Sequence, residues 1–180
     1  SSERLVREWH ESKGDGGPKM TTINPCVVLG PPMSERHLRG SPSFVMTLLN
    51  REIPFVVPMH ISIVDVRDVA EAHVRALTQG KEAGRYLVVS GQMWFREIAR
   101  AVKAANPSLK IPTKQVPYLL SLLVSIFHPR ISLSWARMHL GKRLYWDASP
   151  AERDLGMEWR APEESLLDTV PPVLENGWMG

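Results

Sequence analysis

The chain has 180 residues, of which 43% are hydrophobic and 23% charged, so it is long enough to bury one hydrophobic core. Its formal net charge is only +3, and its 22 basic side chains form no run of five or more, which argues against a nucleic-acid-binding protein. The single cysteine, Cys26, excludes an internal disulfide and favours a reducing compartment, so we expect a cytoplasmic protein.

The most hydrophobic run, from Val116 to Phe127, bears on membrane association. It contains Ser121 and Ser125, and at roughly 12 residues it is shorter than the ~20 residues that span a bilayer, so we expect no transmembrane segment. We interpret it as a buried or substrate-covering helix, with a helix lying on a membrane surface as the alternative. Residues 1–19 are polar and charged, unlike a signal peptide.

Hydrophobic periodicity and turn residues predict helices and strands in alternation. In chain order they predict a helix over residues 1–12, a buried strand over 20–29, a loop over 30–41, a helix over 42–50, short strands over 55–58 and 60–64, a helix over 68–78, a strand over 86–89, helices over 94–105, 117–127 and 132–140, a short strand over 144–146, and helices over 149–154 and 163–176. We expect Ser41 and Asp68 to be N-caps, and Pro171-Pro172 to break the last helix.

The alternation of strands with helices predicts the α/β fold class, with the strands in a parallel sheet. The helices of the last third of the chain predict a separate layer. The strand over 20–29 leads directly into a glycine and two prolines, and ligands of such sheets bind beyond the carboxyl ends of the strands. From spacing alone, a buried strand with a proline-rich exit is the simpler interpretation.

Two segments together resemble the extended short-chain dehydrogenases/reductases, most closely the dihydroflavonol-reductase-like and 3β-hydroxysteroid-dehydrogenase-like members. The first carries Asn24, Pro25, Val28, Gly30 and Pro31 in the spacing of a family string that contacts the nicotinamide. The second, residues 64–73, resembles the family's strand-to-helix junction. Residues 141–156 and 162–177 resemble its C-terminal end, so the similarity covers about residues 1–178.

The resemblance implies NADP or NAD as the cofactor. The implied cofactor-binding residues are Pro25, Cys26, Val27, Val28, Pro42 and Ser43. The last two open a helix, and a helix N-terminus favours a pyrophosphate, although an ordinary Pro-Ser helix start explains them equally well. We read Asp68 and His73 as structural, and no His, Cys or Glu stands at metal-binding spacing near His73, so we expect no metal site.

Two motifs of complete family members do not occur in the chain: Gly-x-x-Gly-x-x-Gly and Tyr-x-x-x-Lys. Tyr86, Tyr118 and Tyr145 are followed four residues later by Ser90, Leu122 and Ser149. We therefore assign no catalytic residue and expect the N-terminal dinucleotide-binding half to be absent. The expectation is a truncated NAD(P)-dependent carbonyl or alcohol reductase that is inactive alone and binds the cofactor weakly or not at all.

The family resemblance also implies a domain organisation. Residues 1–90 would form the C-terminal strands and helices of a Rossmann-like domain, and residues 91–180 a mostly helical substrate-binding cap intertwined with it. The apolar helix over 117–127 favours a small hydrophobic or aromatic carbonyl substrate. An uncovered sheet edge would favour self-association or aggregation. The alternatives are a non-catalytic scaffold or regulatory protein with the family fold, and a fragment of a sugar-nucleotide epimerase or dehydratase.

Overall fold

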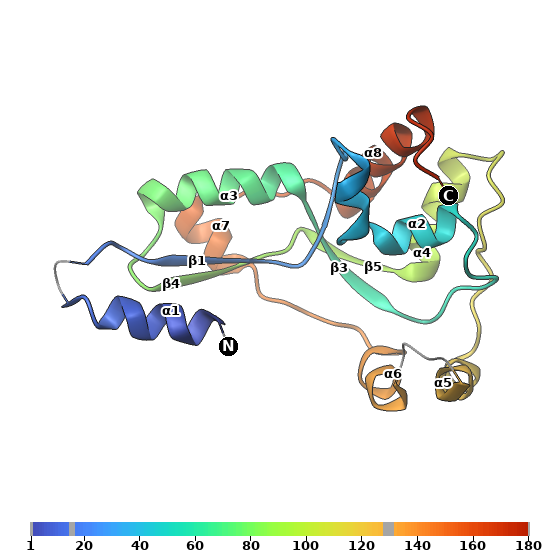
Figure 1. Ribbon diagram of the computed structural model, residues 1–180, viewed down its shortest axis with the longest axis horizontal. Coiled ribbons are helices and arrows are strands. Elements are labelled where there is room, and N and C mark those ends of the chain that lie inside the picture. Colours follow the sequence, from blue (N-terminus) through green and yellow to red (C-terminus); the bar gives the residue numbers. More distant parts are fainter. Residues whose placement is uncertain (1, 15–16, 128–131, 180) are drawn as a thin grey trace.

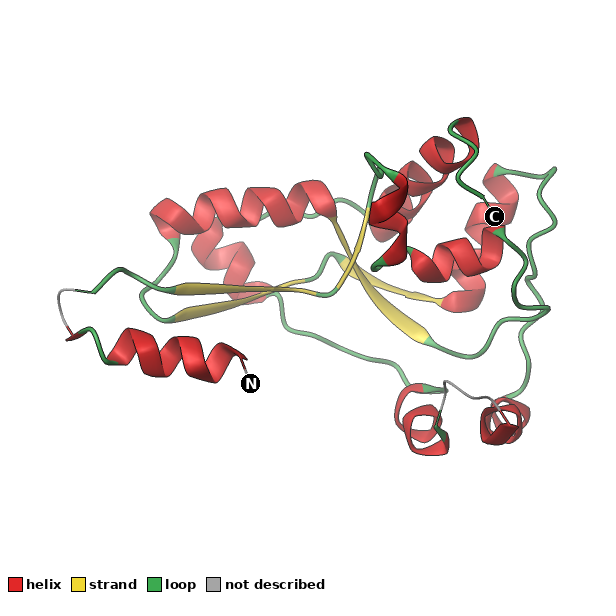
Figure 2. Ribbon diagram, in the orientation of Figure 1, coloured by secondary structure: helices red, strands yellow, loops and turns green. Residues whose placement is uncertain are grey.

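A computed structural model describes residues 2–14, 17–127 and 132–179 (Figures 1 and 2). The elements are α1 (Ser2–Glu11), β1 (Thr21–Pro25), β2 (Val27–Leu29), the 3-10 helix η2 (Glu35–Arg39), α2 (Ser43–Leu49), β3 (His60–Asp65), α3 (Val66–Gln79), β4 (Gly84–Val88), β5 (Gly91–Trp94), α4 (Phe95–Ala105), α5 (Tyr118–Phe127), α6 (Leu133–His139), α7 (Ser149–Leu155) and α8 (Pro162–Glu175). The predicted order of helices and strands is therefore largely confirmed.

The predicted strand over 20–29 is divided at Cys26 and serves two sheets. β1 pairs in parallel with β4, whereas β2 pairs in parallel with β3. β3 also pairs with β5, but antiparallel, so the expectation of a purely parallel sheet is wrong. The four residues of β5 are all half-buried, and so short a strand carries little alternation for sequence analysis to detect.

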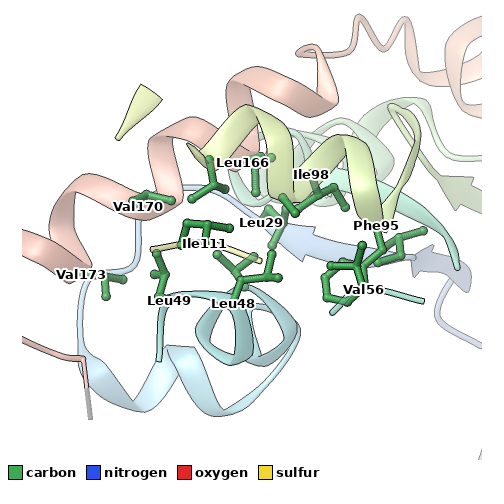
Figure 3. Close-up of a cluster of buried hydrophobic side chains, with 14 of the residues drawn as sticks. Leu29, Leu48, Leu49, Val56, Phe95, Ile98, Ile111, Leu166, Val170 and Val173 are labelled. Atoms are coloured by element: carbon green, nitrogen blue, oxygen red, sulfur yellow. The ribbon is translucent and has the colours of Figure 1, made fainter. Parts of the chain in front are cut away.

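The sheet of β2 and β3 is covered on both faces. The larger core cluster contains Leu29 and Ile63 together with buried side chains of α2, α4 and α8, whereas the next residue of β3, Val64, belongs to a second cluster with α3 and α7. Figure 3 shows Leu48, Ile98 and Leu166 converging around Leu29. Because successive side chains of a strand point to opposite faces, one strand supplies both cores.

Helix α4 confirms its predicted buried face, since Phe95, Ile98, Ala99 and Val102 are all buried. Helices α4 and α8 pack in the same core as β2 and β3, and the division of the chain at about residue 90 stays a prediction. Helices α5 and α6 pack on each other and lie below the sheet in Figure 1, joined to the rest by extended segments.

Both predicted N-caps are wrong. Asp65 caps α3, because its carboxylate accepts the Arg67 backbone N–H at 2.8 Å, whereas Asp68 lies within the first turn and is fully buried. Asp68 instead accepts the Arg160 backbone N–H at 2.9 Å and pairs with the Arg160 guanidinium. At α2 the N-cap position is Pro42, not Ser41, and no side chain caps it.

The structure also differs from the predicted break in the last helix and from two predicted short strands. Helix α8 is continuous through Pro171 and Pro172, because Val170 and Val173 on its buried face hold it against the core, and packing overrides local preference. Residues 144–146 form no strand. In the predicted strand over 55–58, only Val56 forms an isolated bridge, to Gln115. The Nδ1 of the exposed His73 donates a hydrogen bond to the Val69 carbonyl of its own helix at 2.8 Å.

Candidate functional site

The exit from β2 is fixed by contacts that only glycine allows. Gly30 has φ +123°, and a Cβ there would lie 2.9 Å from Cγ1 of Val66. Its N–H donates to Oγ1 of Thr169 at 2.9 Å, and the same hydroxyl donates to the carbonyls of Gly30 (3.1 Å) and Ser165 (2.8 Å) in alternation. Helix α8 therefore holds the backbone where β2 ends.

A hollow of about 360 Å³ opens at this exit. It is lined by Val28, Leu29, Gly30, Pro31, Pro32, His37, Ser41, Pro42 and Val66. We call it the proline hollow. Two of the sequence-predicted residues, Val28 and Pro42, lie in its wall, brought together from β2 and the start of α2.

A second hollow of about 400 Å³ shares Ser41 with the first. It is lined by Cys26, Val27, Ser41, Phe44, Met59, His60, Ile61, Ser62, Trp135, His139, Leu144 and Trp146. We call it the aromatic hollow. Cys26 and Val27 lie in its wall, so four of the six predicted residues line the two hollows. Pro25 and Ser43 belong to the lining of neither, and cofactor contact remains a prediction for all six.

Ser62 is the polar residue of the aromatic hollow that sequence analysis missed. It lies in the fully buried strand β3, and its Oγ has no hydrogen-bond partner among the residues that the structure describes. A buried hydroxyl without a partner is unfavourable by about 1–3 kcal/mol. The signal in the sequence was one serine between two isoleucines.

His60 has a defined environment at the edge of the same hollow. Its Nδ1 accepts the Leu144 N–H at 3.1 Å, and its ring lies 4.8 Å from that of Trp94, centroid to centroid. Burial, followed by the positive charge of Arg143, lowers the pKa of His60 below its usual 6.5. The imidazole is therefore neutral at pH 7 and holds the segment after α6 against β3.

Charged side chains form a network behind the proline hollow. The Arg67 guanidinium bonds both Asp65 oxygens at 2.8 Å and Asp168 at 2.6 Å, which ties α3 to α8. Burial acts to raise the pKa of Asp65, but the hydrogen bonds from Arg67 outweigh it and the pKa is lowered. The same bonds raise the pKa of Arg67. This network keeps Val66 in place against Gly30.

The Cys26 thiol lines the aromatic hollow but is a poor nucleophile. Burial raises its pKa to about 12, and the thiolate is the reactive form. Within the described residues, no group of His, Cys, Asp and Glu side chains could hold a metal ion. No helix in the described ranges is both long and apolar enough to cross a membrane.

The chain is similar in sequence to known reductases over part of their length. Over 169 residues the chain is 27% identical to cinnamoyl-CoA reductase 1 of Arabidopsis thaliana, covering 94% of this chain and 43% of that protein. Over 171 residues it is 35% identical to the ketoreductase azaE of Aspergillus niger, covering 87% and 44%. The chain matches part of an extended short-chain dehydrogenase/reductase. No family model matches it.

The match to members of this family, which is also called the NAD-dependent epimerase/dehydratase family, covers only part of each relative named here. The chain spans a little under half the length of the curated relatives named above. The crystal structure of yeast methylglyoxal/isovaleraldehyde reductase Gre2 complexed with NADPH superposes with a TM-score of 0.68 at 22% identity, over 96% of this chain and 52% of that one. At this identity the superposition shows a shared α/β fold.

Proposed function

We propose that this chain forms the nicotinamide-facing and substrate-facing part of an NAD(P)-dependent carbonyl reductase. The observation that carries the proposal is the pair of hollows that meet at Ser41, directly beyond the string that resembles the family's nicotinamide contact. The reductases among the relatives, and Gre2 with its NADPH, support it by analogy.

The walls of the proline hollow fit a nicotinamide ring. Val28 and Pro42 offer apolar surfaces for the flat ring. Gly30 is buried and, because it carries no Cβ, lets β2 end close against Val66. The N–H of Gly30 is already used by Thr169, so contacts to a carboxamide would come from neighbouring backbone groups. When bound, the nicotinamide supplies or accepts a hydride.

The aromatic hollow has the lining expected for a small hydrophobic or aromatic carbonyl compound. Phe44, Met59 and Trp135 contribute apolar surface to its lining. Within this hollow, the basic groups in the lining are two histidines. A diphosphate sugar would need cationic partners, so this lining favours a reductase over the sugar-nucleotide alternative.

Substrate reduction also requires a proton donor, for which the chain offers no Tyr-x-x-x-Lys pair. We therefore expect the 180-residue chain alone not to reduce any carbonyl substrate. The test has two readouts. With NADPH and a panel of aldehydes and ketones, no consumption of NADPH is expected. In amide NMR spectra at millimolar NADPH, shifts should concentrate at Val27, Val28 and Ser41.

The control amides in that titration are those of α7, such as Ala151, which lines neither hollow. Turnover by the chain would contradict the inactive assignment. Shifts at α7 but not at the β2 exit would contradict the nicotinamide assignment. A scaffold with no nucleotide site would show neither turnover nor localised shifts, and UDP-glucose in place of NADPH tests the epimerase alternative.

A further inference from the structure

Helix α5 buries its polar face. Ser121 and Ser125 lie one turn apart and are only 3% and 5% exposed. Their hydroxyls donate to the carbonyls of Pro117 (3.1 Å) and Leu122 (2.7 Å). Helix α5 is packed against α6, where Ala136 is also fully buried.

The opposite face of α5 points outward and is entirely apolar. Leu119 is 76% exposed, Leu123 53% and Ile126 58%, and Leu120 beside them is 44% exposed. With 3.6 residues per turn, these positions form one stripe along the helix. A surface helix normally turns its apolar stripe toward the protein core. An apolar stripe that faces outward therefore indicates a site that contacts an apolar partner.

Aromatic and sulfur-containing side chains are also exposed on α6 and on the segment after it. Met138 on α6 is 61% exposed, and Tyr145 and Trp146 on the following segment are 75% and 52% exposed. Trp135, also on α6, is 40% exposed. We call the exposed residues 119, 120, 123, 126, 135, 138, 145 and 146 the hairpin surface. Trp and Tyr are the residues enriched where proteins meet the headgroup region of a bilayer.

Charge is distributed unevenly along the chain, in a way that singles out the same region. Residues 98–146 contain eight Lys and Arg and no Asp or Glu. The rest of the chain therefore holds 14 of the 22 basic residues against all 19 acidic ones. Lys114 before α5, Arg137 on α6, and Lys142 and Arg143 after α6 are exposed, and the nearest acidic residue, the exposed Asp147, follows Trp146. Positive charge therefore predominates beside the hairpin surface.

We propose that the hairpin surface docks on an anionic lipid bilayer, with α5 lying in the plane of the headgroups. An apolar stripe, interfacial aromatic residues and flanking Lys and Arg side chains are the three features of helices that bind bilayers in this way. Basic side chains near an anionic membrane each add favourable electrostatic attraction. The proposal concerns peripheral binding, because α5 has 10 residues and does not span a bilayer.

The charge pattern also favours lipid over a second copy of the chain. Two copies joined through this surface would bring Lys142 and Arg143 of each near those of the other, and like charges repel across an interface. An anionic bilayer instead provides negatively charged headgroups for the basic side chains and an apolar acyl-chain region for the stripe of α5. The inference rests on α5 and its flanking charges and does not require the proposed reductase function, and it shares two residues with the aromatic hollow, Trp135 and Trp146.

The test is flotation of the 180-residue chain with phosphatidylcholine vesicles that contain about one third phosphatidylserine, compared with pure phosphatidylcholine. We expect binding to the anionic vesicles that weakens as salt is added. The variant Leu119→Ser/Leu123→Ser/Ile126→Ser should lower the affinity at least about tenfold. Lys142→Ala/Arg143→Ala should lower it by roughly fivefold per charge removed.

Two control variants carry the same kinds of substitution, apolar to Ser and basic to Ala, at exposed positions outside the hairpin surface. Leu77 and Val74 on α3 are 85% and 66% exposed, and Leu77→Ser/Val74→Ser should leave binding unchanged. Arg36→Ala/Arg39→Ala in η2 is the charge control. Binding unaffected by the α5 variant, or no binding to anionic vesicles by a chain with native circular dichroism, would overturn the proposal. Sedimentation that shows the α5 variant dissociating an oligomer, without vesicle binding by the parent, would assign the surface to a second copy.

Discussion

The buried carboxylate of Asp68 gives the sharpest test of how this fold is held together. It lies on the first turn of α3 and holds Arg160, 92 positions later, through the backbone N–H at 2.9 Å and through the guanidinium. Asp68 is fully buried, whereas the Arg160 side chain is 36% exposed. Replacing Asp68 with Ala removes both interactions and leaves the Arg160 N–H without its acceptor.

The expected loss of stability follows from these exposures. Removing one member of a buried ion pair costs about 3–5 kcal/mol, but Arg160 regains part of its hydration, so we expect about 2–4 kcal/mol for Asp68→Ala. Asp68→Asn keeps an acceptor for the N–H and should lose about half as much. If Asp68 were an N-cap, Asp68→Ser would preserve stability and Asp68→Ala would lose only about 1 kcal/mol.

Urea unfolding followed by circular dichroism measures these differences as shifts in midpoint at constant slope. The control is Glu71→Ala, which removes a partly exposed ion pair with Arg75 on the same helix and should change stability by less than about 0.5 kcal/mol. An Asp68→Ala variant no less stable than Glu71→Ala, or full rescue by Asp68→Ser, would refute the assignment of Asp68 as the link between α3 and residue 160.

Three further predictions each concern one residue. Gly30→Ala should lower the free energy of unfolding by about 1–3 kcal/mol, because φ is +123° and the new Cβ meets Val66; urea unfolding measures it. Because the pKa of His60 is lowered in the folded state, its contribution to stability is present above pH 6.5 and lost as pH falls through the folded pKa; unfolding midpoints should drop on acidification, less so in His60→Gln. Cys26 should react slowly with a thiol reagent at pH 8 until urea unfolds the chain, since burial raises its pKa to about 12.

Sequence analysis predicted the elements whose signals are local and failed where partners lie far along the chain. The buried face of α4 follows from the spacing of Phe95 and Ile98, and the structure confirms it. Asp65 and Asp68 both precede or open a helix and are equivalent as capping residues in sequence. Only the position of Arg160 decides that one caps and the other makes a distant contact.

The candidate site shows the same limit. The string around Val28 identified the strand exit, and four of the six predicted residues line the two hollows. The roles of Thr169 and Ser62 depend on contacts with Gly30 and on the absence of a partner among the described residues, and neither leaves a sequence signal. The helix over 117–127 was predicted to be buried or to cover a substrate. In the structure Leu119, Leu123 and Ile126 are exposed, because periodicity alone does not reveal which face of a helix is buried, and substrate covering stays a prediction.

Strand β3 offers no position at which a side chain can change freely. All six of its residues are buried, and neighbouring positions such as Ile63 and Val64 supply opposite cores. A shift of register by one residue would exchange every contact between the two cores, so the strand admits a single alignment. Enlarging Ile63 would strain the α4–α8 side and enlarging Val64 the α3–α7 side. Adaptation of this fold to new ligands is therefore restricted at Ile63 and Val64, whereas His60, Ile61 and Ser62 of the same strand line the aromatic hollow.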